Sequence, residues 1–286
     1  MLSRELPTDL TSVDDIREYR RVGAARATDV QEVCHRWGVA QREFAVDGTR
    51  VTSFVGANAR FARARVVFLH GGGLIAGSRF DGVDVVVRHA AELGLEVWTV
   101  EYPLAPEASF DRMIAIAVAS VEAATADGTP VLLAGQSAGG AVAAAASLAC
   151  RDRGLAFHGL MLICPMLSRR PNAAKRQFVD DPSWSARSND TAWSAALESS
   201  DATPPGERVN LGGLPPTYLD CGSAELFRDD VVDFATRLWV HGISAELHVW
   251  SGTFHGSDGV AEQAAASVES HKTRREWLGR WIREDL

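Results

Sequence analysis

The chain has 286 residues, of which 46% are hydrophobic and 23% charged, and it carries a formal net charge of −8 at pH 7. A chain of this size and composition can bury one large core, so we expect a single domain over residues 1–286. The acidic balance and the lack of a basic run with interleaved aromatic residues argue against nucleic acid as a partner. The N-terminus lacks the apolar region of a signal peptide and no apolar stretch is long enough for a bilayer, so we expect a cytoplasmic protein without a membrane span.

The first predicted elements are helices at about residues 8–37, followed by two strand-like runs at 41–46 and 51–56. Between the two runs stands Asp47-Gly48, a dipeptide that favours a tight two-residue hairpin. We therefore expect the two runs to be antiparallel strands at the start of a sheet.

Beyond residue 60, short apolar runs alternate with longer amphipathic or alanine-rich segments. The runs cover residues 66–69, 97–102, 131–134, 160–164, 217–221 and 245–250. Apolar strands that alternate with helical segments are typical of a mostly parallel sheet covered by helices on both faces. The sequence therefore predicts the α/β class.

Two regions do not follow this alternation, and we expect them to form a helical cap. They are the N-terminal helices, at approximately residues 1–38, and an insertion at approximately 168–210. A cap of this kind excludes water from a site and limits the size of its substrate. Trp184 and Trp193 lie in the insertion, where they either close an apolar pocket or anchor the insertion to the body of the domain.

The segment His70-Gly71-Gly72-Gly73 directly follows the first apolar run of this alternation. Glycine N–H groups that no side chain obstructs can converge on a carbonyl oxygen as it gains negative charge during acyl transfer. We expect Gly72 and Gly73 to be such donors, with His70 and Gly71 supporting the turn. The alternatives are a simple glycine turn and a dinucleotide-binding turn over residues 71–77.

A second glycine-rich segment, Gly135-Gln136-Ser137-Ala138-Gly139, stands between an apolar run and an alanine-rich stretch. This is the pattern of a nucleophile elbow, in which a serine occupies a sharp turn from a strand into a helix. The flanking glycines avoid the clashes that side chains would make in the strained turn. We expect Ser137 to be the exposed nucleophile, and the N–H of Ala138, at the helix N-terminus, to be a third oxyanion donor.

A serine hydroxyl needs a histidine base, and the chain contains eight histidines. His255 lies in a glycine-flanked loop after the last apolar run, where a triad with the chain order nucleophile, acid, base places its base. Four other histidines have structural interpretations: His70 belongs to the glycine turn, His241 precedes a helix-ending glycine, His248 lies in a strand and His271 in a long helix. We therefore expect His255 to be the base.

The acid that orients this base should lie between the serine and the histidine, just past a strand. Glu225 follows the apolar run at 217–221 and is the best candidate. Asp220 falls within the strand itself, while Asp229 and Asp230 fit the N-terminal charges of the next helix. These three aspartates remain alternatives to Glu225.

Taken together, these segments resemble the hormone-sensitive-lipase-like branch of the α/β-hydrolases, also called bacterial family IV esterases. Four blocks match in the same order, and the resemblance spans about residues 60–260. The blocks are residues 70–73, 101–107, 135–140, and 214–218 running into 225–230 and then 254–256.

The resemblance implies an α/β-hydrolase fold with a mostly parallel eight-stranded sheet and a helical cap, and a catalytic triad of Ser137, Glu225 and His255. Members of this family usually carry an aspartate at the positions of Gln136 and Glu225 and an arginine at that of Pro103. Only the change at Glu225 touches the inferred chemistry, because its extra methylene must be accommodated.

The resemblance further implies a serine carboxylic-ester hydrolase that acts on small, short- to medium-chain esters or lactones through an acyl-enzyme on Ser137. The same triad would serve an acyltransferase, a natural-product deacetylase or a lactonase, and a hydrolase-like scaffold can also persist as a non-catalytic ligand receptor. A homodimer is implied as one oligomeric option, because members of the family often dimerise.

We expect no cofactor and no metal. The four cysteines have no C-x-x-C spacing, so reduced buried thiols are favoured over disulfides or metal ligands. They are Cys34, Cys150, Cys164 and Cys221.

Overall fold

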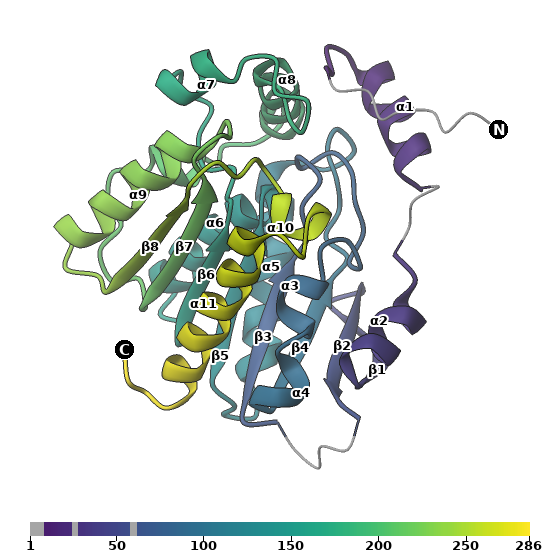
Figure 1. Ribbon diagram of the computed structural model, residues 1–286, viewed down its shortest axis with the longest axis vertical. Helices are drawn as coiled ribbons and strands as arrows, with labels where there is room; N and C mark the ends of the chain where they lie inside the picture. Colours follow the sequence, from purple (N-terminus) through teal and green to yellow (C-terminus); the bar gives the residue numbers. More distant parts are fainter. Residues whose placement is uncertain (1–8, 25–27, 58–61) are drawn as a thin grey trace.

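One eight-stranded sheet forms the centre of the molecule in the computed structural model, which describes residues 9–24, 28–57 and 62–286 (Figure 1). The strands are β1 (Val39–Val46), β2 (Thr49–Gly56), β3 (Ala64–Leu69), β4 (Leu95–Val100), β5 (Val131–Gln136), β6 (Gly159–Ile163), β7 (Thr217–Gly222) and β8 (Ala245–Trp250). Their spatial order is β1-β2-β4-β3-β5-β6-β7-β8. The strands from β4 to β8 pair in parallel, whereas β1 and β2 are antiparallel to their neighbours. The predicted α/β class and the mostly parallel sheet are confirmed.

The predicted hairpin joins β1 to β2 through the two residues Asp47 and Gly48. Both have positive φ angles, 50° and 75°, and Val46 pairs with Thr49 across the turn. Positive φ at both central residues is the geometry that twists in the same sense as the flanking strands. The antiparallel start of the sheet is therefore fixed by local sequence.

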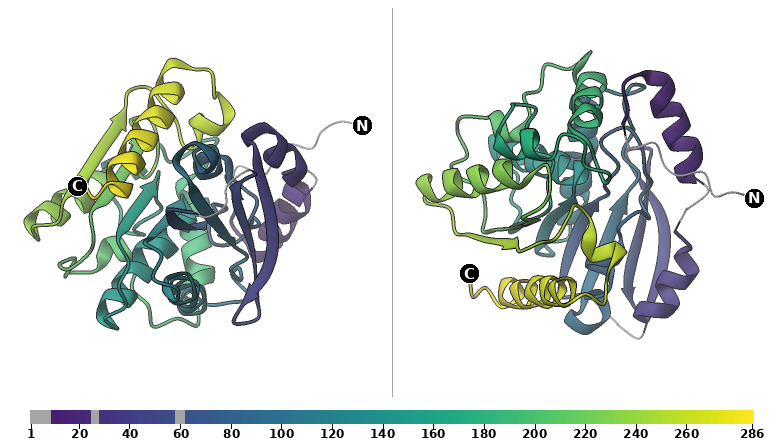
Figure 2. Two further views of the ribbon diagram at one scale, coloured as in Figure 1. Left: turned by 90° about the horizontal axis from the view of Figure 1, so that it is seen from below. Right: turned by 45° about the horizontal axis from the view of Figure 1, so that its top comes forward.

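Helices cover both faces of the sheet (Figure 2). They are α1 (Val13–Ala24), α2 (Val30–Trp37), α3 (Asp84–Val87), α4 (Ala90–Leu93), α5 (Phe110–Thr125), α6 (Ala138–Asp152), α7 (Ala173–Gln177), α8 (Ala186–Leu197), α9 (Arg228–Val240), α10 (Ser257–Val260) and α11 (Ala265–Ile282). The apolar side chains of α5, α6 and α9 form one core with the sheet, and those of α3, α4 and α11 form a second core. Within the described residues, no helix is both long enough and apolar enough to cross a bilayer.

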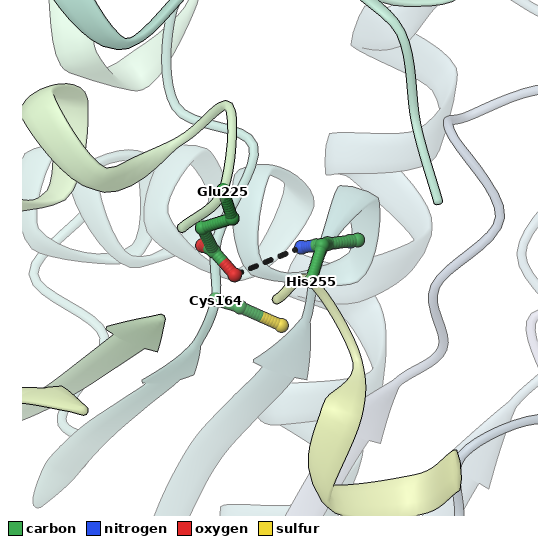
Figure 3. Close-up of side chains that lie close together, drawn as sticks. All are labelled: Cys164, Glu225 and His255. Atoms are coloured by element: carbon green, nitrogen blue, oxygen red, sulfur yellow. Dashed lines mark ion pairs between the residues drawn. The ribbon is translucent and has the colours of Figure 1, made fainter. Parts of the chain in front are cut away.

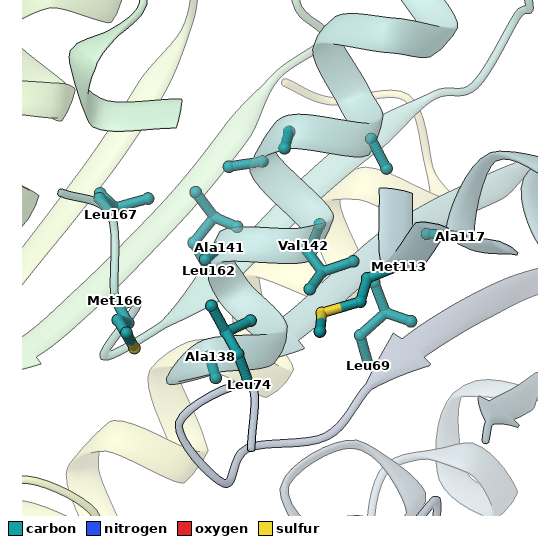
Figure 4. Close-up of a cluster of buried hydrophobic side chains, with 14 of the residues drawn as sticks. Leu69, Leu74, Met113, Ala117, Ala138, Ala141, Val142, Leu162, Met166 and Leu167 are labelled. Atoms are coloured by element: carbon teal, nitrogen blue, oxygen red, sulfur yellow. The ribbon is translucent and has the colours of Figure 1, made fainter. Parts of the chain in front are cut away.

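The core on the α5 and α6 side fixes the position of the elbow (Figure 4). Val142 of α6 and Met113 of α5 are completely buried there beside Leu69 and Leu162 of the sheet. Burial of a large aliphatic side chain contributes about 1.5–3 kcal/mol, and the many alanines of α6 allow its backbone to approach the strands closely. The first turn of α6 is thereby held at the carboxyl ends of the central strands.

The two parts of the predicted N-terminal cap element, approximately residues 1–38, lie in different places. The segment before α1 reaches α8, because the Leu10 N–H donates to Ser188 Oγ and Thr191 Oγ1 donates to the Leu10 carbonyl. In contrast, α2 packs against the body of the domain, where Val33 is buried in the core beside α3 and α4. α2 thus buries its apolar face on the sheet side, and the extent of the cap remains a prediction.

Two buried histidines on the α11 side make the fold sensitive to acid. Burial, with Arg88 adding repulsion, lowers the pKa of His89 from 6.5 to about 3, and burial together with Arg274 lowers that of His271 to about 4. The unfolded chain therefore binds more protons than the folded chain as the pH falls below 6.5. Each histidine contributes stability that is fully present above pH 6.5 and is lost as the pH falls toward its folded-state pKa.

We expect the free energy of unfolding to fall by roughly 1.4 kcal/mol per pH unit for each of these histidines between about pH 6 and pH 4. Urea denaturation at several pH values measures this slope. His89→Gln should reduce this slope by roughly 1.4 kcal/mol per pH unit, the contribution of one proton. His35→Gln, at an exposed position of α2, should leave the slope unchanged. Equal slopes for the wild type and His89→Gln would contradict the expectation.

Candidate active site

The nucleophile elbow has the strained geometry that its sequence predicts. Ser137 stands between β5 and α6 with φ 54° and ψ −119°. A Cβ atom at Gly135 would lie 2.2 Å from the Gly139 carbonyl oxygen, and one at Gly139 would lie 2.0 Å from the Leu69 carbonyl oxygen. Only glycine can therefore occupy these two positions, and the close approach that they allow holds Ser137 at the turn.

Backbone hydrogen bonds fix the elbow to the neighbouring strand. The Ser137 N–H donates to the Ile163 carbonyl at 2.8 Å, and the Met166 N–H donates to the Ser137 carbonyl at 2.9 Å. The end of β6 and the segment that follows it thus form hydrogen bonds with both the N–H and the carbonyl of Ser137. The strain of the turn is balanced by these bonds, and the hydroxyl remains available for chemistry.

The glycine turn after β3 lies beside the elbow and is held by His70 and Tyr102. Their rings stack with centroids 4.2 Å apart, and the Tyr102 hydroxyl donates to the His70 carbonyl at 2.7 Å. Burial lowers the pKa of His70, so the ring is neutral, and its Nδ1 lies 2.7 Å from the Gly71 carbonyl oxygen, to which it donates. Because α3 begins only at Asp84, no helix starts directly after the glycines, as a dinucleotide-binding turn would require.

The candidate oxyanion donors are not used by the fold itself. Among the residues that the structure describes, the N–H groups of Gly72, Gly73 and Ala138 make no hydrogen bond. The amide of Ala138 also stands at the N-terminus of α6, where the helix dipole favours negative charge. Three free donors near one serine can stabilise an anionic oxygen without reorganisation.

The structure brings His255 to Ser137, 118 residues away in the chain. Nε2 of His255 lies 2.9 Å from the Ser137 hydroxyl oxygen. His255 is in the loop between β8 and α10, and that loop is bonded to the loop after β7 through the Ala224 N–H, which donates to the Thr253 carbonyl at 3.0 Å. A base within hydrogen-bond reach of the proton it would accept is the geometry that nucleophile activation needs.

Glu225 is the acid that the structure places beside this base (Figure 3). It is fully buried, and its Oε2 lies 3.4 Å from Nδ1 of His255. The three alternative acids are engaged elsewhere, as their ion pairs and hydrogen bonds show. Asp220 pairs with Arg274, Asp229 with Arg228 and the N–H of Ala174, and Asp230 with Lys175.

Glu225 favours the protonated form of His255, which is the form that a base takes once it has accepted a proton. Burial disfavours the charged form of His255, but the sulfur of Cys164 and the carboxylate of Glu225 oppose it and raise the pKa of His255 above its ordinary value. Burial also raises the pKa of the Cys164 thiol to about 11, so the thiol is neutral near pH 7. We therefore attribute the raised pKa of His255 to its ion pair with Glu225; burial also raises the pKa of the Glu225 carboxyl, and His255 opposes that rise.

A buried ion cluster anchors the loop that carries His255. The Arg274 guanidinium of α11 donates to Asp258, three residues after His255, and its Nε donates to Asp220 of β7 at 2.7 Å. Arg274 is almost completely buried. Because removal of one partner would leave an unpaired buried charge, this cluster ties the base loop firmly to the adjacent strand.

Sequence reasoning did not place Cys164, Arg274 or Asp258 at the site. Cys164 was expected only as a buried reduced thiol, and it is indeed a free cysteine, but its sulfur lies beside Glu225 and His255 (Figure 3). Its position directly after β6 was a usable signal, because the carboxyl ends of parallel strands meet at one edge of a sheet. Arg274 and Asp258 carried no comparable signal.

The insertion after β6 borders a large cavity beside these residues. The cavity has a volume of about 660 Å³ and is lined by residues 177–183 together with Ala224 and Phe254. The last two immediately precede Glu225 and His255 in the chain. A cavity of this size is within the range that takes small-molecule ligands.

Trp184 of the insertion lies on the glycine turn. A Cβ atom at Gly73 would stand 2.1 Å from Cη2 of the indole, so the ring rests directly on this glycine. Tyr19 of α1 packs edge to face with the same indole, with ring centroids 6.3 Å apart. The insertion and α1 thus meet over one of the candidate oxyanion donors.

Comparison with known proteins agrees with this geometry. The model of the α/β hydrolase fold family matches residues 66–258. Carboxylesterase NlhH of Mycobacterium tuberculosis is 30% identical over 226 residues, with 72% of this chain and 70% of that protein covered. Hormone-sensitive lipase of Mus musculus is 31% identical over 126 residues, which cover 41% of this chain and 17% of that protein.

Among solved structures, a bacterial heroin esterase has a TM-score of 0.82 at 29% sequence identity, with 95% of this chain and 93% of that chain covered. The similarity therefore extends over nearly the whole fold. From the family match and these relatives, we conclude that the chain belongs to the α/β hydrolase fold family, in its hormone-sensitive-lipase-like branch, and that it is a serine hydrolase of the carboxylesterase type.

Proposed function

We propose that the protein hydrolyses small, short- to medium-chain carboxylic esters or lactones through an acyl-enzyme on Ser137. The observation that carries the proposal is the 2.9 Å separation between the Ser137 hydroxyl oxygen and Nε2 of His255. This pair stands at a strained elbow whose neighbouring N–H groups are free. Acyl transfer is the reaction that requires a nucleophile, a base and oxyanion donors in this arrangement.

In the proposed reaction, His255 Nε2 accepts the hydroxyl proton as Ser137 Oγ attacks the carbonyl carbon. The carbonyl oxygen becomes negative and accepts hydrogen bonds from the N–H groups of Gly72, Gly73 and Ala138. The imidazolium then gives its proton to the leaving alkoxide oxygen, and the alcohol departs. Water attacks the acyl-enzyme, its proton passes to His255, and the acid is released with the serine restored.

In this mechanism Glu225 keeps the proton of the neutral imidazole on Nδ1 and stabilises the imidazolium that forms. Its burial makes the carboxylate a weakly screened charge, so the electrostatic effect on His255 is large. The glutamate replaces the usual aspartate of the family, and its longer side chain reaches Nδ1 at 3.4 Å. The extra methylene is thus compatible with the role.

A series of p-nitrophenyl esters from acetate to palmitate tests the proposed activity. We expect the highest kcat/KM among the short chains, and a fluorophosphonate adduct that mass spectrometry assigns to the peptide containing Ser137. An adduct without turnover of any ester would favour acyl transfer or a narrow natural substrate. The proposal is wrong if neither an adduct nor turnover is found. A homodimer and a cytoplasmic location remain predictions from the sequence.

We further expect Trp184 to limit the length of the acyl chain, because its indole rests on Gly73 beside the candidate oxyanion site. Trp184→Ala would leave an apolar space that additional methylenes of a substrate can enter. The ratio of kcat/KM for p-nitrophenyl octanoate to that for the butyrate should rise by about fourfold for each methylene that the space admits. Steady-state kinetics on both esters measure this ratio.

Trp239→Ala is the matched control, because Trp239 of α9 is 48% exposed and outside the residues that border the cavity. It should leave the ratio unchanged. If Trp184 only anchors the insertion, Trp184→Ala will lower the melting temperature and leave the ratio at its wild-type value, and the expectation for chain length will be wrong.

A further inference from the structure

Cys164 places a thiol against the acid and the base of the site (Figure 3). Its sulfur, a carboxylate oxygen of Glu225 and a ring nitrogen of His255 all lie within 4.8 Å of one another. Cys164 has φ 38°, in the left-handed region that favours glycine, and its N–H donates to the Asp220 carbonyl at 2.8 Å. Cys164 therefore has a backbone conformation that residues other than glycine rarely adopt.

The polar atoms of this cluster are weakly hydrogen-bonded, because the 3.4 Å between Nδ1 of His255 and Oε2 of Glu225 is longer than a normal hydrogen bond. Within the described chain, neither carboxylate oxygen of Glu225 nor Nδ1 of His255 makes a hydrogen bond of normal geometry. Glu225 is completely buried and the Cys164 residue is 5% exposed. Buried polar atoms without partners are costly, and several of them around one point favour a ligand that satisfies them together.

We propose that Cys164, Glu225 and His255 form an inhibitory binding site for Zn²⁺. Thiolate, carboxylate and imidazole are the ligands that zinc takes in proteins, at about 2.0–2.3 Å. Two such ligand atoms, one nitrogen and one oxygen, stand about 3.4 Å apart in a tetrahedral site, and Nδ1 of His255 lies 3.4 Å from Oε2 of Glu225. The sulfur of Cys164, which lies within 4.8 Å of these ligand groups, would have to approach them more closely to bind the metal.

The surroundings of the cluster also suit a hydrated cation. A cavity of about 20 Å³, lined by Cys164, Glu225 and Arg274 among others, is large enough for one water molecule, the fourth ligand of a tetrahedral zinc. Arg274 is paired with both Asp220 and Asp258. These two carboxylates balance the guanidinium, so the charge of Glu225 is left to His255 or to a cation that takes the place of its proton.

Zinc at this position would remove the base of the proposed reaction, and this consequence rests on the proposed function. Nδ1 must offer its lone pair to the metal, so the proton of the neutral imidazole has to reside on Nε2. An Nε2–H group donates to the Ser137 hydroxyl and cannot accept its proton. The Cys164 thiol loses its proton to the solvent as the zinc–sulfur bond forms, and no oxidation or reduction takes place.

Inhibition by Zn²⁺ tests the site through activity. We expect Zn²⁺ to inhibit hydrolysis of p-nitrophenyl butyrate and EDTA to restore the metal-free rate. In Cys164→Ser, compared with its own metal-free rate, half-inhibition should require on the order of 100-fold more Zn²⁺, because a ligand is lost. Cys150→Ser, which changes a buried thiol of α6, should respond like the wild type. Equal Zn²⁺ sensitivity of Cys164→Ser and the wild type would overturn the proposal.

Binding of Cd²⁺ tests the site without activity. In the Ser137→Ala protein, which keeps all three ligands, Cd²⁺ should produce an ultraviolet thiolate-to-cadmium absorbance that saturates at one equivalent and disappears when Cys164→Ser or Cys164→Ala is added. The second substitution serves if the first lowers stability. Failure to see this Cys164-dependent absorbance overturns the site. Its presence together with full wild-type activity in Zn²⁺ supports the site and contradicts the proposed role of His255 as the base.

Discussion

Ser137→Ala should lower kcat/KM for p-nitrophenyl butyrate by about 10⁴-fold or more, because removal of a nucleophile leaves only the rate enhancement from binding and oxyanion stabilisation. The substitution removes one oxygen atom at a position where the backbone is equally strained for serine and alanine, with φ 54°. The fold should therefore be unchanged, and the melting temperature should stay within about 2 °C of the wild type. Steady-state kinetics and differential scanning calorimetry check the two expectations.

Ser147→Ala provides a matched control in the same helix. Ser147 is buried in α6, and its hydroxyl donates to the Ala144 carbonyl, so the substitution changes one buried serine at a distance from the elbow. It should keep the wild-type kcat/KM. If Ser137→Ala retains a rate within tenfold of the wild type, with no trace of contaminating wild-type enzyme by mass spectrometry, the assignment of the nucleophile is wrong.

Glu225→Gln should lower kcat by about 10³- to 10⁴-fold with little change in KM. The substitution keeps the size of the side chain but removes the charge that favours the imidazolium, and the amide can donate to Nδ1 and stabilise the wrong tautomer of His255. Because this loss occurs in the transition state and not in substrate binding, kcat carries the effect. Pre-steady-state release of p-nitrophenol should show slow acylation in the variant.

The alternative acids are tested by Asp229→Asn and Asp230→Asn. Both aspartates are bound to α7, through the Ala174 N–H and through Lys175 respectively, so their loss should affect the attachment of the insertion and change kcat by no more than a few-fold. A loss of kcat at Asp229→Asn or Asp230→Asn that equals or exceeds the loss at Glu225→Gln would move the role of the acid away from Glu225.

The elbow and the base were predictable because each depends on short-range sequence and on chain order. Gly135 and Gly139 specify the sharp turn locally, and parallel strands bring their carboxyl ends to one edge of the sheet, where Ser137 and His255 meet. The position of Glu225 follows from the same rule, one strand away from His255. None of these inferences required knowledge of how side chains pack.

The residues that sequence reasoning missed depend on packing between distant segments. Cys164 contacts the site because of the rotamer and the left-handed backbone that its neighbours impose, and a single sequence does not show either. Arg274 reaches Asp258 only when α11 lies across the sheet. Periodicity can show that a helix has a face to bury and not which surface covers it, so the sequence does not show that Val33 of α2 packs in the core with α3 and α4.

The insertion between β6 and β7 has a consequence for how such enzymes can diversify. The two ends of the insertion lie close together, because the Gly206 N–H of the returning chain donates to the Leu167 carbonyl at 2.8 Å. An insertion with close endpoints can be exchanged or lengthened at a small entropic cost, since each doubling of loop length costs only about 0.6 kcal/mol. The insertion could therefore be exchanged between related enzymes, provided that the α1 region that contacts α8 is transferred with it.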